Sequence, residues 1–325
     1  MIPPRRFSRL RIGVFAAIER AAVLLGGRAL HRRHLRRERL HVREEPVAVP
    51  DLPPQLEGFS IAHLSDIHAG PFLGRGDLDG VREILADLAP DVVCWTGDYV
   101  VHGIHNVAPM HGDLAALVGS RATFAVFGNH DYLHREEWRF VEAMEPAGWR
   151  FLRNASAVVE VDGARVGFCG IEDPEEGKVV DVEGAMAGLE EAGVALTVAL
   201  SHGPRAAPEF AARGARVVLS GHSHGTQVDL PFLRDLGPSH PGLRVELGGA
   251  TLVVSRGLGV IGAPLRVGVP AEVVVLRLHG GAGPVASDHV TSDHVTSDHV
   301  ADEAVASGPA ASGGAAGRAS APSDR

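Results

Sequence analysis

Residues 58–68 read GFSIAHLSDIH, an apolar run followed by an aspartate and a histidine two positions apart. The run from Phe59 to Leu64 predicts a buried β-strand, because it is short, apolar and preceded by a glycine. Asp66 and His68 come just after it. Residues two apart in an extended chain point to the same side, so this stretch predicts that Asp66 and His68 share one metal ion.

The same arrangement recurs at four later points of the chain. Each time, a strand-like apolar run ends in polar residues of the metal-ligand type. Helical patterns at 78–88 and 136–144 lie between such runs, so the order predicts βαβ units and an α/β fold. The runs are 91–96, 122–127, 194–200 and 215–219, followed by Gly97-Asp98, Gly128-Asn129-His130-Asp131, Ser201-His202-Gly203 and Gly221-His222-Ser223-His224.

These five clusters are expected to meet in one place. Open α/β sheets bind ligands outside the carboxyl ends of their strands, which is where each cluster lies. Any one cluster would be weak evidence, because a single motif match often arises by chance and a lone histidine at a strand end is usually structural. Five clusters in succession predict a metal centre.

The remaining patterns complete the expected domain. Asp162-Gly163 is a two-residue turn signal between two strand-like runs, which predicts a β-hairpin. Three late runs are expected to close a second sheet. The hairpin strands are 157–161 and 165–170, the other helical patterns are 114–118 and 182–191, and the closing strands are 243–247, 250–255 and 272–278.

Charge and composition divide the chain into three parts. Residues 1–45 hold twelve Arg and four Glu, a formal charge of +8. Because the whole chain has a formal charge of −9, the remaining residues carry −17. A basic leader at 1–45 therefore precedes a domain at 46–279, whose acidity argues against nucleic acid as a partner. The tail at 280–325 has no aromatic residue and is predicted to be disordered. Its three Ser-Asp-His-Val repeats favour repeat expansion over loose metal binding.

The leader supports two interpretations. The apolar stretch from Ile12 to Leu25 is interrupted by Glu19 and Arg20, and it is shorter than the ~20 residues that span a bilayer. It is either a packed or solvated helix, or an amphipathic segment on an anionic membrane surface, aided by the basic run Arg28 to Arg43. A bacterial-type cytoplasmic or peripheral membrane location fits both.

The ordered set of motifs resembles that of the calcineurin-like metallophosphoesterases over about residues 58–278. The resemblance implies a four-layer α/β/β/α sandwich of the metallo-dependent phosphatase type, with a dinuclear metal centre. By position, the resemblance implies that one ion is bound by Asp66, His68 and His224, a second by Asn129, His202 and His222, and that Asp98 bridges the two. It also implies two catalytic residues: His130, which faces the scissile phosphate, and Asp131, which orients His130.

The chemistry of these residue types agrees with that function. Mixed nitrogen and oxygen ligands suit Mn²⁺, Fe or Zn²⁺. Two such ions about 3.5–4 Å apart can clamp a phosphoryl group and supply hydroxide near neutral pH. The expected reaction is hydrolysis of a phosphomonoester or phosphodiester by that hydroxide, with His130 assisting the leaving group.

Several motifs resemble more narrowly a bacterial branch with membrane-associated members, which includes enzymes acting on UDP-2,3-diacylglucosamine or the cell envelope. This resemblance implies a lipid-linked or cell-envelope substrate. Thr226 departs from the branch, which has glycine at this place. The motifs are Leu64–His68, Thr96–Tyr99, Gly221–Gln227 and Ser255–Gly259.

Two other functions remain open at this point. One is a membrane-tethered metal-binding or scaffolding protein without turnover, and the other is a nuclease, which the acidic domain disfavours. Three histidines, His102, His105 and His111, follow the second cluster in an expected loop. They could contact a substrate phosphate, although loop histidines are more often solvated.

Overall fold

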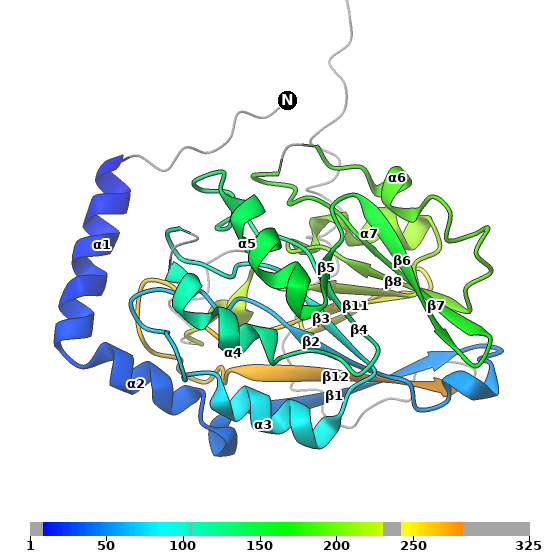
Figure 1. Ribbon diagram of the computed structural model, residues 1–325, viewed down its shortest axis with the longest axis horizontal. Helices are drawn as coiled ribbons and strands as arrows, with labels where there is room; N and C mark the ends of the chain where they lie inside the picture. The colour runs from blue at the N-terminus through cyan, green and yellow to red at the C-terminus, as the bar shows by residue number, and fades with distance from the viewer. Residues whose placement is uncertain (1–8, 104–105, 178, 230–241, 282–325) are drawn as a thin grey trace, which may run out of the picture. The chain divides into compact units, whose positions relative to one another are not determined.

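The computed structural model describes residues 9–103, 106–177, 179–229 and 242–281. Within these ranges the chain forms two mixed six-stranded β-sheets (Figure 1). The first has the order β1 (His41–Val49), β12 (Glu272–Gly280), β2 (Ser60–Leu64), β3 (Val92–Trp95), β4 (Ala122–Ala125) and β5 (Trp149–Phe151). The second has the order β10 (Arg244–Leu247), β11 (Ala250–Val254), β9 (Val217–Ser220), β8 (Leu196–Leu200), β7 (Ala164–Gly170) and β6 (Ala155–Val161).

The two sheets pack face to face, and helices cover both outer faces (Figure 1). This confirms the four-layer α/β/β/α architecture. Because successive side chains of a strand point to opposite faces, strands buried on both sides are almost wholly apolar. The covering helices are α3 (Asp79–Leu88), α4 (His111–Ala115) and α5 (Glu137–Met144) on the first sheet, and α6 (Val182–Met186) and α7 (Ala207–Ala212) on the second.

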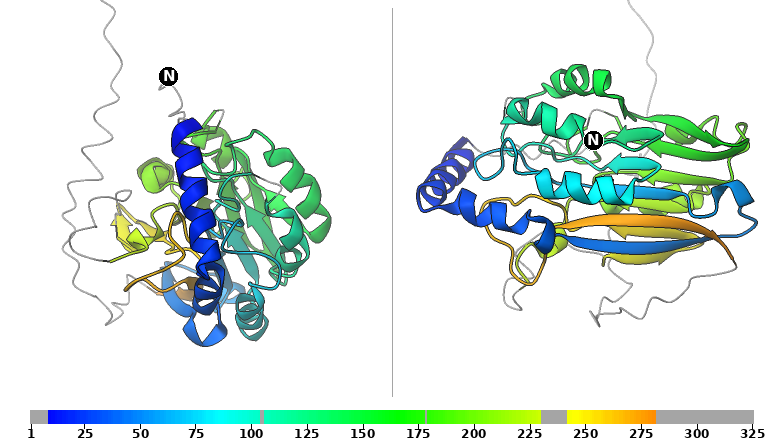
Figure 2. Two further views of the ribbon diagram at one scale, coloured as in Figure 1. Left: turned by 90° about the vertical axis from the view of Figure 1, so that its left-hand side faces the viewer. Right: turned by 60° about the horizontal axis from the view of Figure 1, so that its bottom comes forward.

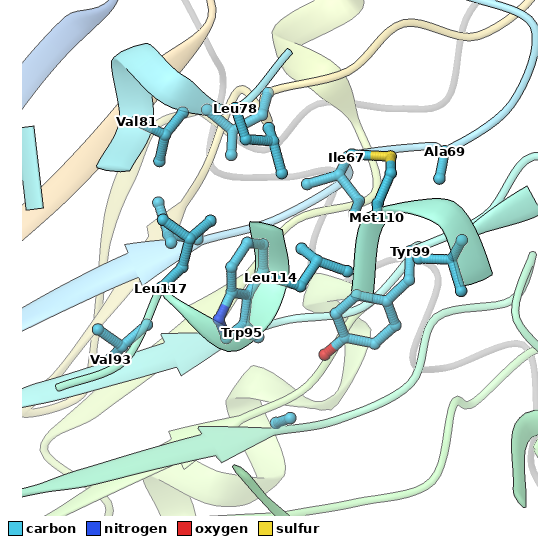
Figure 3. Close-up of a cluster of buried hydrophobic side chains, with 14 of the residues drawn as sticks. Ile67, Ala69, Leu78, Val81, Val93, Trp95, Tyr99, Met110, Leu114 and Leu117 are labelled. Carbon is cyan, nitrogen blue, oxygen red and sulfur yellow. The ribbon is translucent and has the colours of Figure 1, made fainter. Parts of the chain in front are cut away.

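Strand β3 shows how one strand serves two cores. Val93 and Trp95 belong to the core beneath the helices of the first sheet, together with Leu114 of α4. Figure 3 shows these side chains between the strands and the helices. Val92 and Cys94 belong to the core between the sheets. The strand ends at Trp95, and the polar cluster with Asp98 follows directly.

The expected position of β12 in the second sheet is wrong. The strand pairs antiparallel with β2 and parallel with β1, so it lies inside the first sheet. Strand β1 was not expected, because Glu44, Glu45 and Pro46 interrupt its apolar pattern. An edge strand tolerates proline, since one of its sides needs no hydrogen bond. Residues 41–45, which were predicted to belong to the leader, are thus part of the first sheet.

Most of the other expected elements are confirmed, with shifted ends. Strands β6 and β7 form the hairpin, and Asp162 and Gly163 both have the positive φ of its turn. Helix α4 begins three residues before the expected start at Leu114, and α6 ends at Met186, five residues before the expected end. Gly188, with φ of 86°, follows that early end. Helix α7 was not expected.

Two helices of the leader, α1 (Arg9–Leu24) and α2 (Gly27–His34), precede β1. They lie beside the end of the first sheet where β12 begins (Figures 1 and 2). Because β12 runs antiparallel to β2, this is also the end at which β2 stops and its polar cluster follows. No helix in the described ranges is long and apolar enough to cross a membrane. The tail from residue 282, with its Ser-Asp-His-Val repeats, lies outside those ranges.

Candidate metal centre

Asp66 and His68, which follow β2, face His224, which follows β9. The Nε2 atom of His68 lies 3.0 Å from Nε2 of His224. The Oδ1 atom of Asp66 lies 3.8 Å from Nε2 of His68 and 3.5 Å from Nε2 of His224. All three residues are buried. Side chains from two sheets thus point their ligand atoms at one place.

A second group brings together Asn129 after β4, His202 after β8 and His222 after β9. The Oδ1 atom of Asn129 lies 3.1 Å from Nε2 of His202 and 3.2 Å from Nδ1 of His222. The two ring nitrogens are 3.2 Å apart. The other nitrogen of His202 contacts the carbonyl oxygen of Thr96 at 2.7 Å, which fixes the direction of the ring.

Asp98 lies between the two groups. Its Oδ2 atom is 3.5 Å from Nε2 of His68 in the first group and 3.3 Å from Nε2 of His202 in the second. Its Oδ1 atom accepts a hydrogen bond of 2.9 Å from the backbone N–H of His130. One carboxylate oxygen therefore faces both groups, which is the placement a bridging ligand requires.

The separations fit two shared cations. Ligand atoms about 2.1 Å from a common ion are about 3.0–3.5 Å apart at tetrahedral or octahedral angles. The contacts within the two groups span 3.0 to 3.8 Å. The two Nε2 atoms of His68 and His224 cannot both point a proton at each other over 3.0 Å, whereas a cation satisfies both lone pairs.

The backbone at these ligands is not extended, so the predicted reason for the convergence of Asp66 and His68 is wrong. Their φ values are 53° and 47°, and Asp98, His222 and His224 are also left-handed. Left-handed residues turn the chain sharply after its strand, and non-glycine residues adopt this conformation at an energetic cost. Hydrogen bonds from Asp66 N–H to Gly97 and from His68 N–H to Asp98, both 3.0 Å, hold the turn.

Two glycines make room for the carboxylates. A Cβ atom at Gly128 would collide with the carboxylate of Asp98, and one at Gly221 would collide with that of Asp66. Glycine is therefore required where the clusters approach one another. Thr226, which replaces an expected glycine, has φ of 69°. A β-branched residue is strained in this conformation, which glycine adopts without that cost.

Burial and mutual charge shift the proton affinities of this centre. Burial raises the pKa of Asp66 to about 6 and lowers that of His68 to about 3. Burial also disfavours the charged form of His202, but Asp98 and the other nearby carboxylates outweigh it and hold the pKa of His202 well above its usual value. In the metal-free protein His202 therefore carries a proton that an incoming ion must displace.

Metal binding is expected to release protons. Because the pKa of His202 is raised, the proton is present at neutral pH and competes with the ion. The apparent affinity for Mn²⁺ should rise with pH, by about tenfold per pH unit for each proton displaced. Calorimetric titration in two buffers of different ionisation enthalpy measures this release. Identical heats in both buffers would contradict the expectation.

The structure gives Asp131 a role that differs from the expected one. The Nδ1 atom of His130 contacts the carbonyl oxygen of Val101 at 2.8 Å, so this carbonyl orients the ring. Both carboxylate oxygens of Asp131 accept backbone hydrogen bonds, from Asp98 at 2.9 Å, Gly128 at 2.8 Å and Tyr99 at 2.8 Å. Asp131 therefore fixes the loops that carry Asp98 and Asn129, and the expectation that it orients His130 is wrong.

Replacing Asp131 with alanine is expected to destabilise the fold by about 3 kcal/mol, because several buried backbone N–H groups lose their acceptor at about 1–3 kcal/mol each. Urea unfolding followed by circular dichroism measures the loss. The stability of Asp131→Asn, which keeps one acceptor oxygen, should lie between that of the alanine variant and that of the natural protein. Equal stability of the alanine variant and the natural protein would refute this role.

A cavity of about 290 Å³ opens onto the centre. Its lining includes Asp98, Asn129 and His130 as well as the apolar residues Val228 and Ile261. His130 is partly exposed there, as a residue that faces a substrate must be. The cavity thus combines candidate metal ligands with two apolar side chains.

Three residues near this cavity were not predicted as site residues. Gln227 donates from its amide to the carbonyl oxygens of Ile261, Ala263 and Leu265 at 3.2–3.3 Å, which shapes the loop carrying Ile261. Glu175 has a carboxylate oxygen 3.9 Å from Nε2 of His222. The acidic run around Glu175 was the one available signal for it, whereas nothing in the sequence connects Ile261 with the metal ligands.

The loop histidines do not line the cavity in the described part of the chain. The Nε2 atom of His102 lies 2.7 Å from a carboxylate oxygen of Glu19 in α1. His111 packs against Phe140, with ring centroids 6.0 Å apart. His105 lies outside the described ranges. The positions of His102 and His111 therefore give no support for contact of either side chain with a substrate.

Residues 59–226 match the family model described as calcineurin-like phosphoesterase. The uncharacterized metallophosphoesterase YkuE of Bacillus subtilis is 27% identical over 82% of this chain and 95% of its own length. An uncharacterized metallophosphoesterase of Aquifex aeolicus is 29% identical over 80% and 98%, respectively. A transmembrane protein with metallophosphoesterase domain from Danio rerio is 31% identical over 71% of this chain and 56% of its own.

Proposed function

This chain belongs to the calcineurin-like phosphoesterase family, whose members are metal-dependent hydrolases of phosphoric esters, and we propose that it works with two divalent ions. The position of Asp98 carries the proposal, because one oxygen lies within 3.5 Å of a histidine of each group. The proposed ligands are Asp66, His68 and His224 for one ion, Asn129, His202 and His222 for the other, and Asp98 for both.

Bound there, the two ions would supply Lewis-acid charge and would lower the pKa of a water molecule. The residues of the chain do the rest. His130 lies at the cavity beside Asp98, with its Nδ1 against the Val101 carbonyl, so its Nε2 is free to approach a phosphoryl oxygen or the leaving group. A proton held on that nitrogen stabilises the charge that develops as the ester bond breaks. Mn²⁺, Fe and Zn²⁺ suit the ligand set.

We propose a substrate with an apolar substituent, in keeping with a lipid-linked or cell-envelope phosphoester. Val228 and Ile261 support this, since they line the same cavity as the proposed metal ligands. Apolar side chains in a cavity favour an apolar group on the substrate, because their contact removes apolar area from water.

The proposed function is tested by hydrolysis with Mn²⁺-loaded protein. The panel consists of an aryl phosphodiester, an aryl phosphomonoester, a nucleotide-sugar lipid and single-stranded DNA. We expect turnover of at least one ester, with the lipid-bearing substrate preferred. Stoichiometric Mn²⁺ binding without turnover of any of them would overturn the proposal and indicate a metal-binding scaffold. Preference for DNA would indicate a nuclease.

We further propose that the leader rests on an anionic membrane surface and that the catalytic domain begins with β1. Leu24 and Leu25, at the end of α1, are 87% and 89% exposed, and Ile18 is 53% exposed. Arg33 of α2 and Arg36 just after it are also exposed. Exposed apolar side chains next to arginines are the composition that binds anionic lipid.

Sedimentation with lipid vesicles tests this second proposal. The natural protein should bind vesicles that contain phosphatidylserine and should not bind vesicles of phosphatidylcholine alone. The double variant Leu24→Asp, Leu25→Asp should remain in solution, while its ester hydrolysis in detergent-free buffer should be unchanged. Equal sedimentation of the variant would contradict the proposed contact.

A further inference from the structure

A buried glutamate in the leader contacts the loop that orients His130. Glu19 of α1 is 2% exposed, although most charged side chains lie at the surface. Its carboxylate accepts a hydrogen bond of 2.7 Å from Nε2 of His102. The leader is therefore joined to the segment that follows Asp98.

That segment is paired with the turn that carries the first ligands. Ala69 donates from its N–H to the carbonyl oxygen of Tyr99 at 2.8 Å, and Val101 donates to the carbonyl oxygen of Ala69 at 3.2 Å. Val101 is the last residue of this pairing, and its carbonyl oxygen lies 2.8 Å from Nδ1 of His130. His102 comes next in the chain, and its side chain is held by Glu19.

The leader has further attachments to the body of the protein. Gly27 of α2 packs so closely on Pro264 that a Cβ atom would lie 2.8 Å from the proline ring. Arg32 of α2 forms an ion pair of 2.6 Å with the buried carboxylate of Asp77. Loss of the Glu19 contact alone should therefore leave α2 in place, so its effect can be measured in a folded protein.

We propose that Glu19 is a positioning residue, which acts through His102 on the Val101 carbonyl and so sets the orientation of the His130 ring. The inference rests on the proposed function, because it concerns a residue of the same site. It adds that the leader is part of the catalytic apparatus. Without Glu19, the end of the 99–101 pairing is free to move, and the acceptor for His130 moves with it. A displacement of about 1 Å in such a support can lower a rate by ~10²-fold.

The test uses Glu19→Ala, Glu19→Gln and His102→Ala in the full-length, Mn²⁺-loaded protein with an aryl phosphodiester. Glu19→Ala and His102→Ala should each lower kcat about tenfold, with KM and bound Mn²⁺ within about twofold of the natural protein. The double variant should be no slower than either single one, because both remove one contact. Glu19→Gln, which keeps an acceptor oxygen, should restore most of kcat. Glu83→Ala, on the exposed side of α3, is the matched control.

A second readout does not depend on turnover. The ¹⁵N resonances of the His130 ring in metal-free protein should change in Glu19→Ala and His102→Ala, and return in Glu19→Gln. Unchanged kcat and unchanged resonances would overturn the inference and leave Glu19 as an attachment for α1 only. Absence of turnover in the natural protein would instead count against the proposed function, while the resonances would still test the inference.

Discussion

Replacing Asp98 with asparagine is expected to lower kcat/KM for an aryl phosphodiester by about 10³-fold. The substitution keeps the shape of the side chain but removes the negative charge that faces both groups of ligands, at 3.5 Å from His68 and 3.3 Å from His202. Two cations held close together repel each other, and a carboxylate between them offsets that repulsion by attracting both. Metal catalysis supplies several kcal/mol of charge stabilisation, and about 4 kcal/mol corresponds to ~10³ in rate.

The measurement pairs initial rates with the metal content of the purified variant. We expect Asp98→Asn to bind fewer than two Mn²⁺ ions per chain. Asp79→Asn makes the same chemical change at the exposed start of α3, and it should behave as the natural protein does. Full activity of Asp98→Asn with two bound ions would rule out the bridging role.

Replacing His130 with alanine is expected to lower kcat by about 10²–10⁴-fold, the range for loss of a general acid. Its backbone N–H donates to Asp98 and its ring contacts Val101, so the ring is fixed by main-chain atoms. The ring belongs to neither group of proposed metal ligands. The variant should therefore keep both ions and lose turnover, which distinguishes it from Asp98→Asn.

Leaving-group dependence makes the role of His130 specific. The loss in His130→Ala should be largest for an ester with a poor leaving group, such as an alkyl phosphodiester, and smaller for a nitrophenyl ester that needs no protonation. His134→Ala, at an exposed position four residues later, is the control. An equal loss for both esters would exclude leaving-group protonation and leave only charge stabilisation at the phosphoryl oxygens.

The sequence could predict that the ligand clusters meet, because each follows an apolar strand and strand ends share an edge. Asp66, Asp98, Asn129 and His202 were found in this way, and the structure brings them within a few ångströms of one another. The two sheets and the hairpin at Asp162-Gly163 followed from apolar runs and turn residues. These are local signals, and they required no knowledge of which strand pairs with which.

What the sequence could not predict depends on contacts between distant segments. The four backbone N–H groups that donate to Asp131 come from two loops, and no spacing rule reveals them. The left-handed turn at Asp66 and His68 exists because backbone bonds to residues 97 and 98 stabilise it. In the sequence, Glu19 only interrupts an apolar stretch. Its contact with His102 is visible only in the structure.

The place of β12 has a consequence for biosynthesis. This strand is translated last among the described elements, yet it separates β1 from β2 in the finished sheet. A nascent chain on the ribosome therefore holds β1 without its neighbour and β2 with a bare edge until residues 272–280 emerge. Bare strand edges invite pairing with other chains. Chaperones that shield such edges during translation are expected to raise the yield of this protein more than helpers that act after release.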